Sequence, residues 1–250
     1  MTEAVMTAAV LAFCSIVQGM IGFGFSLFSV PLLLLLGGTL PQAVALSAVA
    51  STLQRSVMAH QLHRSVPWRR IGGVIALTLI GLPLGILLLR ELGSATSSFV
   101  KRVVGSLVLA TLACRWFVRV QPSERVHPVW GALAGLCAGV LQGLANVGGP
   151  PLVLWALAHR WSAERLRGVA PVIMLFLSPF QIVLLYRVFG AGVWPAWMHW
   201  IIYVPVVVAA TVTGLQIGKR LPVARLRVAA YALLALLALA LMLDPLSALR

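Results

Sequence analysis

Two glycine-rich segments hold the residues best suited to chemistry. Residues 17–31 read VQGMIGFGFSLFSVP, and residues 141–155 read LQGLANVGGPPLVLW. Side-chain amides can donate hydrogen bonds to oxyanion oxygens, and a helix that starts at a glycine break presents free N–H groups and the positive end of its dipole. We therefore expect a small-anion site where the two segments meet. Its candidate residues are Gln18, Gly22, Gly24, Ser26, Gln142, Asn146, Gly148 and Gly149.

Arg55 is a further candidate for this site. Ser47, Ser51, Gln54 and Arg55 are spaced i, i+4, i+7 and i+8, which places them on one face of a helix predicted over 41–60. Arg55 could attract an anion into a vestibule. Alternatively, its long side chain could reach out to the cytoplasmic surface. Ser178 and Gln181 lie near a proline on the corresponding segment of the second half.

The glycine-rich motif also has a simpler interpretation. Glycines in membrane helices can serve close packing alone, and glutamine can join neighbouring helices by hydrogen bonds. The motif occurs twice, however, each time with a Gln-Gly pair and a proline nearby. The repetition favours a binding site over packing alone.

The composition predicts an all-α polytopic membrane protein. Hydrophobic residues make up 61% of the 250 positions and charged residues 10%, and the mean hydropathy is +1.02. Long apolar runs, such as 71–89 and 103–113, suit membrane helices. The net charge of +14 does not indicate nucleic-acid binding, because the basic residues lie in short clusters between apolar runs.

Several function classes lack the residues that they need. The acidic residues lie at or near the ends of apolar runs, so no mid-membrane carboxylate supports a cation antiporter. They are Glu3, Glu91, Glu124, Glu164 and Asp244. No P-loop, HExxH motif or Ser/His/Asp arrangement is present, so we expect neither an ATPase nor another enzyme, and no cofactor. The cysteines, Cys14, Cys114 and Cys137, show no metal spacing, and we expect them to be buried apolar residues.

The chain repeats itself at an offset of 124 residues. Gln18-Gly19 aligns with Gln142-Gly143 at this offset, and further along the chain the segment 81–85 (GLPLG) resembles 214–218 (GLQIG), at an offset of 133. We therefore divide the chain into membrane repeats 1–125 and 126–250. Each has an interrupted apolar stretch, 4–37 or 128–158, followed by three apolar segments. These are 41–60, 69–90 and 99–119, then 166–186, 194–217 and 226–243.

The basic residues decide how the interrupted stretches cross the membrane. If each stretch crosses once, the basic residues divide almost evenly between the two sides. If each returns as a broken helical hairpin, loops 61–69, 115–127, 159–167 and 219–227 share one side. Together with Arg70 they carry 13 of the 19 Lys and Arg residues, as cytoplasmic loops do. The hairpins then give two inverted repeats, with both termini outside and the two hairpin tips near the midplane.

The motifs resemble a known family. Gly22-Phe-Gly24-Phe-Ser-Leu-Phe-Ser-Val-Pro31, followed by Pro41-Gln-Ala-Val-Ala-Leu-Ser47, resembles the first signature of the TauE/SafE family of sulfite exporters. Gly143-Leu-Ala-Asn146-Val-Gly-Gly-Pro-Pro151 resembles the second. The resemblance implies a bacterial inner-membrane permease for small sulfur-containing anions, such as sulfite or organosulfonates, that more often exports than imports. The pair Phe25-Ser26 stands where members often carry further glycines.

We therefore expect a secondary transporter that exports such an anion by alternating access, one repeat rocking against the other. Its expected partners are the anion and the lipid bilayer, and the oligomeric state stays open. Two alternatives also stay open: a passive anion channel, and a membrane scaffold subunit that transports nothing.

Overall fold

In the computed structural model, helices joined by short connections make up the part of the chain that it describes. This part comprises residues 2–21, 24–62, 66–117, 122–123, 126–190, 193, 200–220 and 223–243. The prediction of an all-α membrane protein is confirmed. The helices are α1 Thr2–Ile21, α2 Phe25–Leu35, α3 Leu40–Leu62, α4 Trp68–Gly93, α5 Ser97–Phe117, α6 Pro128–Ala145, α7 Gly149–Leu157, α8 Ala163–Phe189, α10 Trp200–Arg220 and α11 Val223–Leu243.

Both predicted interruptions are real breaks between helices. α1 ends at Ile21 and α2 begins at Phe25, and α6 ends at Ala145 and α7 begins at Gly149. We call these the first break and the second break. Gly24 ends the first break with φ of +104°, a left-handed conformation that costs glycine little. After each break the chain continues with a short helix and then three longer ones.

Equivalent helices of the two halves pack in equivalent pairs. α1 packs along α10, and α6 packs along α4. The first helix of each predicted repeat therefore lies against the fourth named helix of the other. α3 packs on α8 and α5 on α11. The first two pairs depend on glycine: a Cβ at Gly85 would lie 2.1 Å from the Val140 carbonyl oxygen, and one at Gly214 would lie 2.4 Å from that of Ile16. Small residues let membrane helices approach this closely.

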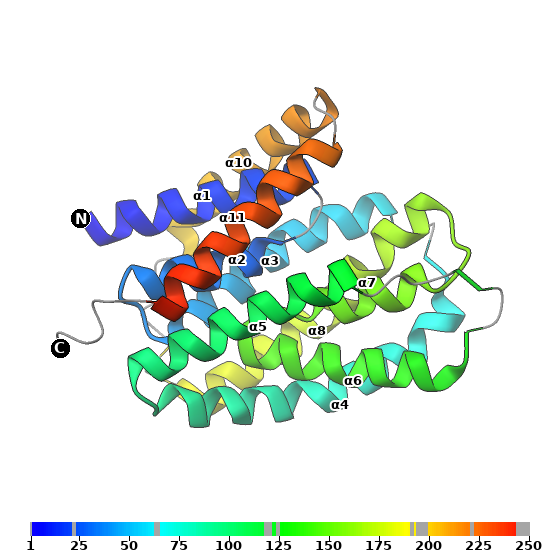
Figure 1. The fold of residues 1–250 in the computed structure, drawn as a ribbon, viewed down its shortest axis with the longest axis horizontal. Helices are drawn as coiled ribbons and strands as arrows, with labels where there is room; N and C mark the ends of the chain where they lie inside the picture. Colours follow the sequence, from blue (N-terminus) through cyan, green and yellow to red (C-terminus); the bar gives the residue numbers. More distant parts are fainter. Residues whose placement is uncertain are drawn as a thin grey trace.

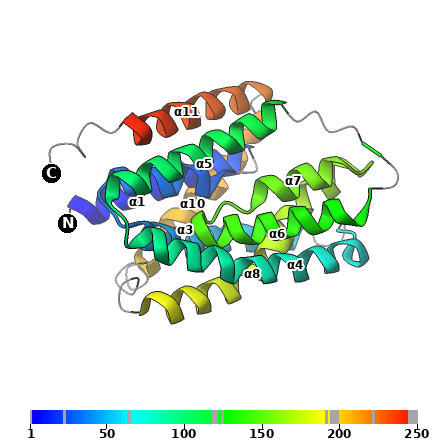
Figure 2. The same cartoon turned by 60° about the horizontal axis from the view of Figure 1, so that its bottom comes forward.

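α1 and α6, the first helices after residues 1 and 126, run in opposite directions along the bundle (Figures 1 and 2). α1 starts at the left-hand end of Figure 1 and runs to the right, whereas α6 starts at the right and runs to the left. α11 ends at the left, where α1 begins. The ends of α3, α7 and α10 and the starts of α4, α6 and α11 gather at the right in Figure 1. The described helix ends that flank the predicted basic loops therefore lie at one end of the molecule.

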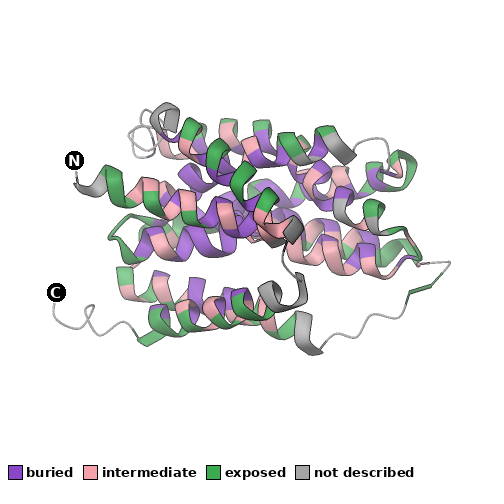
Figure 3. Cartoon of the chain, turned by 90° about the horizontal axis from the view of Figure 1, so that it is seen from above, coloured by how far each residue is buried: buried purple, intermediate pink, exposed green. Residues whose placement is uncertain are grey.

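The outer surface is suited to lipid. Four helical segments of the described residues are long and apolar enough to span a membrane: Trp68–Gly93, Ser97–Cys114, Pro128–Ala145 and Glu164–Phe189. Shorter apolar helices cover Ala4–Met20, Phe25–Leu35, Tyr203–Gly218 and Val228–Leu243. Exposed positions follow the outward faces of the helices (Figure 3), and many are large and apolar, such as Ile80, Leu84 and Leu236. α3 belongs to neither group of apolar helices, because its second half carries polar side chains.

The prediction of buried cysteines is right for one of three. Cys14 is buried, but Cys114 and Cys137 are exposed. Both exposed residues lie on outward faces of membrane helices, where a small apolar side chain suits lipid as well as it suits the core.

Candidate functional site

The two breaks meet inside the bundle, as the sequence predicts. The Asn146 side chain in the second break donates from Nδ2 to the Ser26 Oγ in the first turn of α2, at 2.8 Å. The same nitrogen lies 2.9 Å from Ser47 Oγ and 3.2 Å from Ser51 Oγ, both on α3. All four of these residues are buried. An amide nitrogen has two hydrogens, so three hydroxyl oxygens compete for them.

The conformation of Asn146 explains how its side chain reaches this position. It follows the last residue of α6 with φ of 58°, the left-handed conformation that asparagine tolerates better than other non-glycine residues. Its backbone N–H still closes the helix by donating to the Gln142 carbonyl oxygen, at 2.9 Å. The helix therefore ends with a buried amide side chain directed at α2 and α3.

Arg55 carries the positive charge of the site. Only 8% of the residue is exposed, so the alternative in which it extends to the surface does not hold. It donates from Nη2 to Asn146 Oδ1 at 3.4 Å and from Nη1 to Ser178 Oγ on α8 at 3.5 Å. Both distances are long for N–H···O bonds. Both acceptors are neutral, so a guanidinium with five N–H donors is weakly satisfied.

The acidic residues of the described helices lie away from the middle of the bundle. Glu3 is in the first turn of α1, Glu91 is in the last turn of α4, and Glu164 is in the first turn of α8. Glu124 and Asp244 are outside the described residues. The cluster around Arg55 is therefore cationic overall, with no described helix contributing a carboxylate from its middle.

A glutamine closes each break by the same interaction. Gln18 Oε1 accepts from the Phe25 N–H at the start of α2, at 2.8 Å. Gln142 Oε1 accepts from the Gly148 N–H at the start of α7, at 3.1 Å. Their amide oxygens thus satisfy backbone donors of the breaks, and the expectation that their amide nitrogens donate to an anion stays a prediction. The two glutamines therefore hold the helix starts in place.

Gln142 is also tied to the helices around it. Its Nε2 donates to Asn146 Oδ1 and to Gln181 Oε1 on α8, the latter at 2.8 Å. Gln181 Nε2 in turn donates to the Gln142 carbonyl oxygen, at 2.9 Å. Gln142 and Gln181 therefore fix the amide of Asn146 against Arg55 as positioning residues.

The start of α7 offers fewer N–H donors than expected. Its first residues are Gly149, Pro150 and Pro151, and proline has no N–H. The Gly148 N–H is already bonded to Gln142. A Cβ built on Gly149 would meet nothing within 4 Å, so space remains beside its backbone. The dipole of α7 remains favourable to an anion, but side chains supply most of the donors.

The structure therefore brings together Ser26, Arg55, Gln142 and Asn146 in direct contact and Gly148 through Gln142. Gln18, on α1, bonds the first N–H of α2, and Gly24 directly precedes that helix, while Gly22 is outside the described residues. The candidate set omitted the contacting residues Ser47, Ser51, Ser178 and Gln181, although the helical spacing of the first two with Arg55 indicated them.

One buried polar pair beside the site involves a residue that the sequence did not indicate. Gln54 Nε2 donates to Thr211 Oγ1 on α10 at 3.1 Å. The Gln54 Oε1 is buried and has no partner among the described residues. A buried acceptor of this kind usually binds water.

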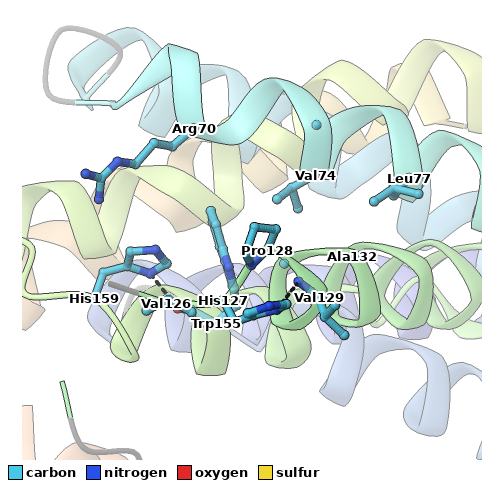
Figure 4. A pocket seen from close by; sticks show the side chains of 12 residues that line it. Arg70, Val74, Leu77, Val126, His127, Pro128, Val129, Ala132, Trp155 and His159 are labelled. Carbon is cyan, nitrogen blue, oxygen red and sulfur yellow. Dashed lines mark hydrogen bonds between the residues drawn. The ribbon is translucent and has the colours of Figure 1, made fainter. Parts of the chain in front are cut away.

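A separate pocket of about 650 Å³ lies where α4 and α6 begin (Figure 4). Arg70 and His159 line it together with apolar residues such as Val74 and Leu77. The His159 Nδ1 lies 3.0 Å from the Trp155 carbonyl oxygen, and its ring stacks on Trp161. Burial lowers the pKa of His159, and Arg70 lowers it further against the opposing effect of the Trp155 carbonyl. Its lining residues on α6, from Pro128 to Ala132, lie about 21–27 Å along the helix from Asn146, too far to belong to the same site.

Buried helix breaks that carry a polar cluster within an apolar bundle define a membrane transporter class. The chain belongs to the sulfite exporter TauE/SafE family, whose model matches residues 7–241. It is 25% identical to the probable inner membrane transporter protein TsaS of Comamonas testosteroni over 175 residues, which cover 66% of this chain and 70% of that protein. No solved structure matches. The chain is therefore a multi-pass membrane protein of a transporter family, and the resemblance seen in the motifs is confirmed.

Proposed function

We propose that this protein is a secondary transporter that exports a small sulfur-containing oxyanion, such as sulfite or an organosulfonate, across a bacterial inner membrane by alternating access. The observation that carries the proposal is the buried guanidinium of Arg55 at the junction of the two breaks. A buried cation with neutral partners is costly unless an anion compensates it. The family match and the inner-membrane relative support the same reading.

The substrate would bind where the breaks meet. Arg55 would supply charge and paired donors to the oxyanion, while Ser26, Ser47 and Ser51 would supply hydroxyl groups. These hydroxyls now accept from Asn146, and an arriving anion could take over the amide hydrogens. Arg55 is almost fully covered, so binding from either side requires the bundle to open.

An inverted repeat is the architecture that we propose for this opening. Its support is the opposite direction of α1 and α6 and the equivalent pairs α1–α10 and α4–α6. In this proposal the basic loops face the cytoplasm.

The moving units of this proposal differ from the sequence repeats. Each glycine-mediated pair joins a helix of one half to a helix of the other, so the halves cannot slide apart as intact blocks. We therefore favour motion of the α4–α6 pair against the α1–α10 pair, with α3, which contacts both α4 and α10, between them.

The test is flux of labelled sulfite and methanesulfonate into proteoliposomes under an imposed membrane potential. The wild type is compared with the double variant Gln142→Ala/Asn146→Ala. Ser106→Ala is the matched control, because this serine is exposed and its hydroxyl donates to the Arg102 carbonyl oxygen of its own helix. Saturable flux that the double variant loses while it stays folded supports the proposal. Absence of flux for every anion at either polarity would overturn it.

The same vesicles separate the two alternatives. A passive channel gives flux that does not saturate and shows no exchange of labelled against unlabelled anion. A scaffold subunit gives no flux, and substitutions at Asn146 leave transport by the cell unchanged. Exchange that exceeds net flux is the outcome expected of a transporter.

A further inference from the structure

The charges at the site also predict which anions it accepts. This inference rests on the proposed function. Arg55 is the charged residue of the cluster, and the side chains that touch it, Asn146 and Ser178, are neutral. Residues one contact further away are also neutral at physiological pH: Ser26, Ser47, Ser51, Gln142 and Met174 through its carbonyl oxygen. Among the described residues of the junction, Arg55 therefore supplies the one full positive charge, and the starts of α2 and α7 add only the partial charges of their helix dipoles.

We infer that the transported species is a singly charged oxyanion, and that doubly charged anions of the same shape are rejected. One negative charge beside Arg55 leaves the occupied site neutral. Two leave an uncompensated negative charge among buried neutral groups, which the low dielectric of the interior penalises. Hydroxyls and amides bind oxygen atoms, but they cannot cancel the second charge.

This selection assigns the form in which sulfite is carried. Sulfite exchanges near neutral pH between a doubly charged form and a singly protonated, singly charged form. The site takes the protonated form, so each exported sulfite carries its own proton outward. Organosulfonates are singly charged at all physiological pH values and need no proton. A carrier of this kind needs no carboxylate relay, in agreement with the positions of Glu3, Glu91 and Glu164 at helix ends.

The experiment compares three labelled anions in the same proteoliposomes. Methanesulfonate and sulfate are both tetrahedral but differ in charge, which separates charge from shape. Methanesulfonate flux is expected to change little between about pH 6 and about pH 8, while sulfate flux is lower by about tenfold or more. Sulfite flux at constant total concentration is expected to fall as the pH rises, in step with its singly charged form.

Each outcome has a separate meaning. Sulfate flux equal to that of methanesulfonate, or sulfite flux that rises with pH, would overturn the inference while leaving the transporter proposal intact. No flux of any of the three anions would instead overturn the transporter proposal. The Arg55→Lys variant keeps the charge with fewer donors, so it is expected to bind more weakly and to retain the preference for methanesulfonate. Loss of that preference in this variant would also contradict the charge argument.

Discussion

The two breaks are built alike but contribute different chemistry. In each, a glutamine on the incoming helix accepts a hydrogen bond from the backbone where the next helix begins: Gln18 from Phe25 and Gln142 from Gly148. The second break adds Asn146, whose side chain contacts α2 and α3. The first break contributes the hydroxyl of Ser26. The shared part positions the helices, and the differing part makes the site asymmetric.

The positive charge of the site also comes from the first half of the chain. Arg55 lies on α3, and the position 124 residues further on is Pro179 of α8. α8 instead presents Ser178 and Gln181 toward the junction. A pair of arginines facing each other would repel and would bind a doubly charged anion. The repeated fold therefore supplies two similar helix breaks, whereas one arginine supplies the positive charge between them.

Removing the positive charge of Arg55 should have the largest effect on anion flux. Arg55→Gln keeps a polar side chain but loses the guanidinium, so anion flux should fall by about a hundredfold or more, as for loss of a charged binding partner. Initial rates in proteoliposomes measure this. Ser56→Ala on the exposed face of the same helix serves as the control. Wild-type flux in a folded Arg55→Gln protein would remove Arg55 from the site.

The second break can be changed without altering its shape. Asn146→Asp places a carboxylate where Oδ1 now accepts from Arg55, and the neighbouring serines can turn their hydroxyls to donate. The new charge pairs with Arg55 and competes with the substrate, so flux should fall by about ten- to a hundredfold. The apparent affinity for methanesulfonate should weaken with it. Unchanged affinity would show that the anion binds away from Asn146.

The two glycine-mediated pairs can be compared by stability. A Cβ at Gly85 would lie 2.1 Å from the Val140 carbonyl oxygen on α6, whereas one at Gly218 would lie 2.8 Å from backbone atoms of Met20 on α1. Gly85→Ala should therefore destabilise the protein more than Gly218→Ala. Overpacking of this kind costs about 1–3 kcal/mol. Thermal unfolding in detergent measures the difference. Gly72→Ala is the control, because its Cβ would meet nothing within 4 Å.

The capping glutamines give a smaller contrast. Gln18→Leu and Gln142→Leu each leave a backbone N–H at a helix start without its side-chain partner, at a cost of about 1–3 kcal/mol. Gln142→Leu should cost more, because Gln142 also bonds to Asn146 and Gln181. Unfolding in detergent measures both variants. Equal losses would mean that the additional bonds of Gln142 add nothing to stability.

Much of this arrangement follows from sequence patterns. Apolar runs and repeated glycine motifs predicted the helices and both breaks, because these depend on local spacing. The motifs also identified Asn146 and Ser26, and helical periodicity indicated Ser47 and Ser51. Whether Arg55 faced the surface or the interior depended on how α3 packs between α2 and α8, which no local pattern determines. The capping role of Gln18 and Gln142 likewise required the geometry of the folded breaks.

The smallest effect should come from the contribution of the first break. Ser26→Ala removes one of the three hydroxyls within reach of Asn146 Nδ2, while Ser47 and Ser51 remain for its two hydrogens. Flux should therefore fall by only about threefold, the scale of a weak neutral hydrogen bond. Ser47→Ala should cost more, because Ser47 also bonds Ser29 at 2.8 Å. A loss at Ser26 as large as that at Asn146 would mean that Ser26 contributes as much to anion binding as Asn146, and that the two breaks share the site equally.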